Sequence, residues 1–286
     1  MLDVGGTGGV RDRTGRTGVG ARPPRLTRRV RAVVAVGCWL VVWQVASVAL
    51  DQPILLVGPW EVLVRLVELV PTGAFWATVG RTLADVVLGF TAAALVAVAL
   101  AAAAAASRWV DALLAPLIAT TRATPVVAFI ILVLLWTDAS HLATVVAFLM
   151  ALPVLYTNVL EGIAHRDARL LEMTRVFAVP WPRRVAAVDV PGVLPYFVAG
   201  CRTGIGLAWK SGIAAEVIGL PVGTIGEQMY QAKLFLATAD LFAWTVVVVV
   251  LAALTERVVL ALLERARRRL AGEPAPPLVD PAGGAR

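Results

Sequence analysis

Three charged residues lie inside one long apolar stretch, residues 192–219: Arg202, Lys210 and Glu216. On a helix, Arg202 and Lys210 would lie about 80° apart, whereas Glu216 would face another side. Charges within an apolar helix usually face a cavity or a charged partner. The two cations therefore predict a positive path for an anion. As structural alternatives, Arg202 reaches solvent from the helix end and Lys210 pairs with an acid on another helix. For Glu216 we expect either a contact at the gate of this path or a bond that holds a neighbouring helix in place.

A second group of polar residues lies in the arginine-rich segment 164–191. Residues 164–177 have apolar positions at helical spacing. Val179-Pro180-Trp181-Pro182 then breaks the helix, because proline lacks a donor and restricts its predecessor. A second short helix, 183–190, is predicted to end at Pro191. Two angled helices with apolar and basic faces predict a docking element for a cytosolic partner, or alternatively a pair that tethers the loop to anionic lipid.

The motifs of common catalytic and nucleotide sites are incomplete in this sequence. A phosphate-binding loop needs Gly-x-x-x-x-Gly-Lys-[Ser/Thr] after a strand. In Gly204–Ser211, Trp209 occupies the second glycine position, and no strand is predicted before it. His141 and His165 are far apart in the chain, with no Ser/His/Asp or metal-ligand cluster around either. We therefore predict no catalytic residue, no metal site and no cofactor in this chain.

The composition indicates that these residues are positioned by membrane-spanning helices. Of the 286 residues, 59% are hydrophobic and 16% are charged, against about 45–50% and about 25% in soluble domains. In lipid only helices or closed barrels satisfy the backbone, and the apolar runs are too long for barrel strands. Cys38 and Cys201 lie in apolar runs and are too few for a disulfide framework or a thiolate metal site. We predict an all-α membrane protein.

Six spans of about 20 mainly apolar residues each are predicted. The first could instead be a signal peptide cleaved after Ser47-Val48-Ala49, but its apolar run is longer than the usual about 7–15 residues, so we expect an uncleaved anchor. The alanine run 101–106 is either a compositional bias or a surface for close helix packing. The spans lie at about 30–50, 82–106, 116–137, 139–160, 192–219 and 241–263, in a domain 30–265 between a flexible basic tail, 1–29, and a disordered tail, 271–286.

The basic residues predict the orientation of these spans. If the six spans alternate in direction across the membrane, 21 Lys and Arg residues lie outside the spans on the side of the termini and of segment 164–191. Three lie on the other side, and Arg202 and Lys210 lie within a span. Because positive residues stay cytoplasmic, both termini should be cytoplasmic. The net charge of +7 is scattered between the spans, so no nucleic-acid partner is predicted. On the outer side, residues 60–70 form an amphipathic helix that packs on the span ends or contacts an external protein. Arg81 and Asp85 should pair locally.

The spacing in segment 164–191 resembles a motif of inner-membrane ABC importer permeases, Glu-Ala-Ala, three residues, Gly, nine residues, Ile-x-Leu-Pro. Here the chain reads Glu172-Met173-Thr174, three residues, Ala178, nine residues, Val188-Asp189-Val190-Pro191. Alanine disfavours the left-handed backbone that glycine allows, so we expect Pro180 and Pro182 to make the bend. Residues of about 50–265 resemble permeases of the nitrate/sulfonate/taurine type, at Pro59–Leu69, Thr82–Phe90, Pro116–Pro125, Leu134–Trp136 and Gly200–Gly219.

The resemblance implies a dimer, usually of identical chains, around a path for a small polar or anionic solute in the bacterial inner membrane. Each loop would insert a coupling helix into a separate cytosolic ATPase subunit, which would hold ATP and Mg²⁺. A periplasmic or lipid-anchored solute-binding protein would deliver the substrate. In this motif, which ends at Pro191, Glu172 and the bend at Ala178 would shape the contact with the ATPase subunit. Polar contacts with that subunit would come from Arg175, Arg183 and Arg184.

Two other classes of protein are weaker interpretations. A secondary transporter driven by an ion gradient would leave the two-helix loop unexplained, and the sequence has no convincing inverted repeat. A membrane enzyme would need the converging catalytic groups that the sequence lacks.

Overall fold

The computed structural model describes the backbone of residues 25–271 and the side chains of residues 30–268. The predicted tails, 1–29 and 271–286, lie outside this range except for the first turn of helix α1 and the last residue of α11. Within the described residues all regular elements are helices. Five of them are long and apolar enough to cross a membrane, and a bent pair makes up to six. The prediction of an all-α membrane protein is confirmed.

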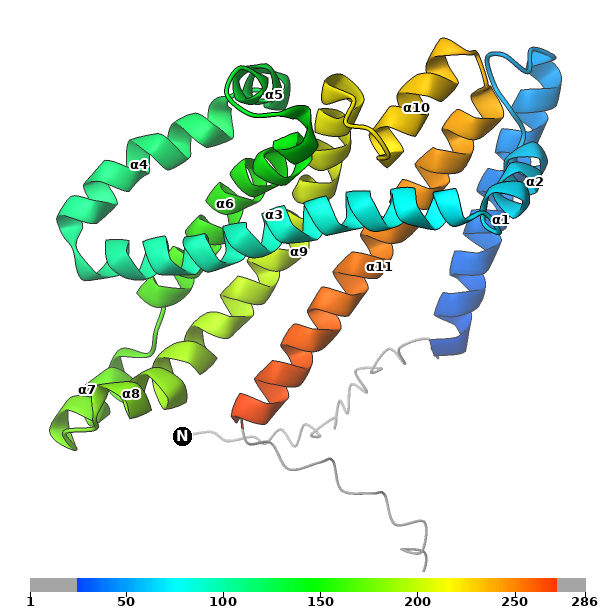
Figure 1. The fold of residues 1–286 in the computed structure, drawn as a ribbon. Helices are drawn as coiled ribbons and strands as arrows, with labels where there is room; N and C mark the ends of the chain where they lie inside the picture. Colours follow the sequence, from blue (N-terminus) through cyan, green and yellow to red (C-terminus); the bar gives the residue numbers. More distant parts are fainter. Residues whose placement is uncertain (1–24, 272–286) are drawn as a thin grey trace, which may run out of the picture.

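The long helices cover most of the predicted spans. They form a slanted bundle with the short helices α7 and α8 at one end and α10 at the other (Figure 1). We name these the α7–α8 end and the α10 end. The long helices are α1 (Arg25–Leu50), α3 (Gly73–Ala106), α6 (Ala139–Ala164), α9 (Val190–Gly219) and α11 (Thr238–Ala271). The short ones are α2 (Pro59–Leu69), α7 (Ala168–Val176), α8 (Trp181–Arg184), the π-helix η1 (Val185–Asp189) and α10 (Ile225–Leu234).

The third predicted span, 116–137, is not one continuous helix. The chain instead forms α4 (Arg108–Ala123) and α5 (Val126–Leu134), which meet at an angle of 104°. Thr124 adopts an extended conformation between them, with φ −78° and ψ 131°. Pro125 disfavours a helical conformation in the residue before it, so the uncharged run bends here although its hydropathy is uninterrupted.

Helices α3, α6 and α9 pack together to form the centre of the bundle. A row of alanines on α3 is buried in this core at spacings of three or four residues, whereas Ala102 and Ala103 between them are exposed. Gly89 continues the row, and a Cβ there would overlap the carbonyl oxygen of Thr144 on α6. One side of the alanine run therefore packs closely against the neighbouring helices. The buried row is Ala93, Ala97, Ala101 and Ala104.

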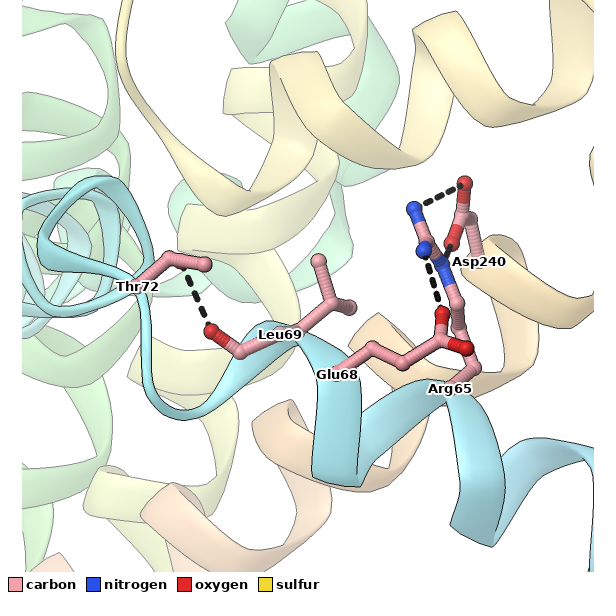
Figure 2. Close-up of polar contacts among 5 residues, drawn as sticks. All are labelled: Arg65, Glu68, Leu69, Thr72 and Asp240. Carbon is pink, nitrogen blue, oxygen red and sulfur yellow. Dashed lines mark hydrogen bonds and ion pairs between the residues drawn. The ribbon is translucent and has the colours of Figure 1, made fainter.

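Helix α2 is fastened to the start of α11 by Arg65. Its guanidinium donates from Nε and Nη2 to both carboxylate oxygens of Asp240, and from Nη1 to Glu68 at 2.8 Å (Figure 2). The hydrogen bonds to Asp240 and Glu68 hold the pKa of Arg65 above its usual value. At its C-terminal end, α2 is closed by the hydroxyl of Thr72, which donates to the carbonyl of Leu69 at 2.7 Å. The predicted amphipathic helix at 60–70 thus packs on a span end.

We predict that Arg65→Gln loosens α2, because it removes the paired hydrogen bonds to Asp240. The pair is partly exposed and screened by water, so the expected loss is about 1 kcal/mol, seen as amide exchange in α2 that is about fivefold faster. Glu68→Gln removes only the exposed contact and should change exchange less. Equal exchange in the two variants would contradict the role of Asp240.

Candidate functional site

The segment between α6 and α9, residues 165–189, forms a helical hairpin that projects from the α7–α8 end (Figure 1). Helix α7 begins after Asp167, whose carboxylate accepts from the backbone N–H of Arg169 at 2.8 Å. The helix breaks as predicted, but the break covers residues 177–180 rather than Val179–Pro182, because α7 ends at Val176 and α8 begins at Trp181.

The predicted end of the second helix at Pro191 is wrong. From Trp181 the chain stays helical through α8, η1 and α9 to Gly219. In a regular α-helix the ring of Pro191 would clash with the carbonyl four residues earlier. The π-helical turn at Val185–Asp189 ends two residues before it and widens the helix. The hairpin is thus joined to α9 without a hinge loop.

Ala178 makes the bend in the hairpin, contrary to the expectation that Pro180 and Pro182 would make it. Its φ is +47°, in the left-handed region. Two capping bonds hold it there: Val179 N–H donates to Thr174 O at 2.9 Å, and Ala178 N–H donates to Arg175 O at 3.1 Å. This pattern closes a helix C-terminus and satisfies carbonyls that would otherwise lack partners. Ala178, which stands where the family motif has glycine, therefore has the backbone conformation that glycine favours.

The outer surface of the hairpin is an uncovered mixture of apolar and charged side chains. Glu172, Arg175 and Arg183 are exposed, and within the described chain their side chains make no hydrogen bond or ion pair. A contiguous exposed apolar surface rimmed by charges is typical of an interaction site. The exposed apolar residues are Leu170, Met173, Val176, Phe177 and Trp181.

Arg184 lies instead at the base of the hairpin, in a cluster that the spacing of the residues does not predict. Asp189 accepts from Arg166 at 2.5 Å through one carboxylate oxygen and from Arg184 at 3.3 Å through the other. Arg166 also donates to the carbonyl of Ile163 at 2.8 Å, at the end of α6. The available signal was a pair of opposite charges where the two flanking helices meet the loop.

Arg202 and Lys210 lie on one side of α9, as their spacing predicts. Both are exposed, and neither forms an ion pair with the described residues. The side chains between them on this side are small, and Gly206 has open space where a Cβ would be. We name this side the α9 stripe. Its exposed or half-buried members are Pro195, Ala199, Arg202, Thr203, Gly206 and Lys210.

Glu216 is separated from the α9 stripe, because it is fully buried at the α10 end. Its Oε2 accepts from the backbone N–H of Gly226 at 2.9 Å and from the hydroxyl of Thr82 at 3.1 Å. The same hydroxyl oxygen accepts from the N–H of Ile225 at 2.9 Å. These are the first two amides of α10, so α9 and α3 together satisfy donors that a helix N-terminus leaves free. A carboxylate is also favoured there by the helix dipole.

Further hydrogen bonds at the α10 end hold α10 and α3 in place. Thr224 caps α10 through its hydroxyl, which accepts from the N–H of Glu227 at 3.3 Å. Asp85 does not pair with Arg81 as predicted: its carboxylate accepts from Thr144 on α6 at 3.2 Å, and no ion pair joins it to Arg81. The polar groups at this end of α3 thus bind other helices rather than each other.

The close contact between α9 and α10 predicts that one added methyl group has a large effect on stability. A Cβ at Gly226 would overlap the Cβ of Glu216 and lie 2.7 Å from its carbonyl carbon, whereas one at Gly80, exposed on α3, meets nothing within 4 Å. We expect Gly226→Ala to destabilise the protein by about 1–3 kcal/mol and lower the thermal unfolding midpoint in detergent by about 3–8 °C. Gly80→Ala should leave it unchanged or raise it. Similar midpoints for the two variants would exclude the tight α9–α10 contact.

Comparison with known proteins identifies the family of this fold and hairpin. Residues 89–270 match the family described as the binding-protein-dependent transport system inner membrane component. The chain is 27% identical over 229 residues to a putative aliphatic sulfonates transport permease protein of Bacillus subtilis, covering 79% of this chain and 82% of that one. It is 27% identical over 230 residues to the taurine transport system permease protein of Escherichia coli, covering 78% and 83%.

A third relative has a different named substrate. The chain is 31% identical over 227 residues to the riboflavin transport system permease protein of Chloroflexus aurantiacus, covering 76% of this chain and 84% of that one. The family match covers most of the bundle from the middle of α3 to the end of α11. The chain therefore belongs to the binding-protein-dependent transport system inner membrane components, and it is a permease subunit of an ATP-driven ABC importer rather than an enzyme.

Proposed function

We propose that two copies of this chain form the solute path of the importer and that the hairpin 165–189 receives the movement of a cytosolic ATPase subunit. The observation that carries this proposal is the unbroken helix Trp181–Gly219, which joins the hairpin to the α9 stripe. A push on the hairpin would turn or tilt the helix that bears Arg202 and Lys210. The excess of Lys and Arg on the hairpin side supports a cytoplasmic position for the α7–α8 end and both termini.

The α9 stripe supports the homodimer. Two exposed cations in the middle of a membrane helix are costly against lipid and need a water-filled path or protein around them. Within the described chain no helix covers this side, so a second copy provides the simplest enclosure. The small side chains around Gly206 would let the copies approach closely and leave room for solute.

The α10 end would form the outer gate. Because Glu216 fastens α10 to α9 and α3, a movement of α9 would carry α10 with it. In this cycle the ATPase subunits, with ATP and Mg²⁺ bound, would close, move the two hairpins and switch the path from one side of the membrane to the other. A periplasmic or lipid-anchored solute-binding protein would deliver solute at the α10 end.

The substrate we propose is a small polar or anionic solute. The names of two relatives, which refer to aliphatic sulfonates and taurine, support an acidic substrate. The paired cations Arg202 and Lys210 would supply a matching positive potential. The riboflavin relative indicates that the same architecture serves larger solutes as well.

The first test of this proposal is a charge reversal on the hairpin. Glu172 is exposed and unpaired in the described chain, so Glu172→Lys should leave folding intact while weakening association with the ATPase subunit by about tenfold or more. The measurement is pull-down from detergent with titrated ATPase subunit. Asp138→Lys, which likewise reverses the charge of an exposed carboxylate but at the opposite end, is the control. Full ATPase recovery with Glu172→Lys would count against the coupling role.

A second test measures whether water reaches the α9 stripe. In a background without Cys38 and Cys201, Lys210→Cys should react with a hydrophilic, charged thiol reagent in the assembled transporter, and the rate should change when ATP is added. Val41→Cys on the exposed side of α1 is the matched lipid-facing control and should stay unreactive. A Lys210→Cys variant as inert as the control would mean that the stripe does not border the path.

A further inference from the structure

A groove lies beside the base of the hairpin, apart from the α9 stripe and the α10 end. Its volume is about 590 Å³, and it opens between the last turns of α3, the end of α6 and the helix that runs from α8 into α9. Apart from the charged cluster at its mouth and Trp181, its lining is aliphatic or aromatic. The apolar lining includes Val98, Ala102 and Ala106 on α3, Ile163 on α6, and Val193 and Phe197 on α9.

The groove extends from the helix ends into the depth of one leaflet. Its lining on α3 runs from Val98 to Ala106, eight residue steps or about 12 Å of helix. This stretch of α3 ends at the α7–α8 end, so the deep part of the groove lies at the level of acyl chains. Water is excluded from that level. An apolar group must therefore fill it.

The mouth of the groove carries a net positive charge. Arg166 and Arg184 share the single carboxylate of Asp189, and all three residues line the groove. Arg184 uses only its Nε for Asp189, so both of its terminal nitrogens are without an acceptor in the described chain. Trp181 borders the same mouth and is 68% exposed, as is common for tryptophan at the membrane interface.

We propose that this groove binds one anionic phospholipid, with an acyl chain between α3 and α9 and the phosphate on Arg184. Basic pockets between membrane helices on the cytoplasmic side have the chemistry that anionic headgroups require. Bound there, the lipid would brace the cluster that fixes the hairpin to α6 and α9. The inference depends on the membrane placement of the bundle and is independent of ATP coupling.

The test uses the full-length chain in lipid nanodiscs and tryptophan quenching by brominated acyl chains. Two samples have the same lipid mixture of phosphatidylglycerol and phosphatidylcholine, but the bromine is on only one of the two lipids. The contribution of Trp181 is isolated by subtracting the signal of Trp181→Phe. We expect bromine on phosphatidylglycerol to quench Trp181 severalfold more than bromine on phosphatidylcholine. Equal quenching by the two lipids, or none by either, would overturn the proposal.

Two variant pairs separate the groove from general lipid contact. Ala102→Phe fills the groove, whereas Ala103→Phe adds the same ring at an adjacent exposed position outside it. Only the first should abolish the preference for phosphatidylglycerol. Arg184→Gln should reduce the preference while leaving the Arg166–Asp189 pair in place. Unchanged preference in Ala102→Phe and Arg184→Gln would refute the site.

The same measurement on the assembled transporter distinguishes the other possible occupants. We expect the quenching specific to phosphatidylglycerol to persist when the ATPase subunits are bound. Its loss on their addition would assign the groove to the ATPase and contradict the lipid proposal. Its absence in the permease alone, with Trp181 shielded from both lipids, would assign the groove to the second permease copy.

Discussion

The constraint on which this structure depends is the absence of water from the bilayer interior. A polar group placed there needs a protein partner, a cavity or a neighbour that neutralises it. Glu216 finds protein partners through its Oε2, which accepts from the N–H of Gly226 and from the hydroxyl of Thr82, and that hydroxyl accepts in turn from the N–H of Ile225. One buried carboxylate thereby determines where three helices meet. Arg202 and Lys210 lack such partners in the described chain, and for that reason we propose that this side of α9 borders the solute path.

The same constraint explains which features the sequence could predict. Long apolar runs have few alternatives in lipid, so the helices at 30–50, 139–160 and 192–219 were predictable within a few residues. The separation of Glu216 from Lys210 followed from helical geometry alone. The bend at Pro125 was harder, because hydropathy is uninterrupted there and only the local effect of proline on Thr124 reveals the break.

The remaining features depend on contacts that spacing does not encode. The left-handed conformation of Ala178 is held by two backbone hydrogen bonds, and alanine by itself gives no sign of it. Asp189 could be seen as a charge at a helix end, but its two arginine partners lie 23 and five residues earlier in the chain, at the start of the hairpin and in α8. Likewise, nothing in the residues around Glu216 indicates that its partner is a helix N-terminus ten residues further on.

The π-helical turn at Val185–Asp189 has a consequence for how such subunits diversify. A π turn contains one residue more than the α turn it replaces. Deleting one residue there, together with replacing Pro191, which a regular α-helix would not accommodate, would restore the α-helix and rotate the hairpin by about 100° around the axis of α9. A change of length at this single point would therefore alter the direction in which the hairpin faces, and, if the hairpin docks on the ATPase subunit as we propose, it would fit the same bundle to ATPase subunits of different shape.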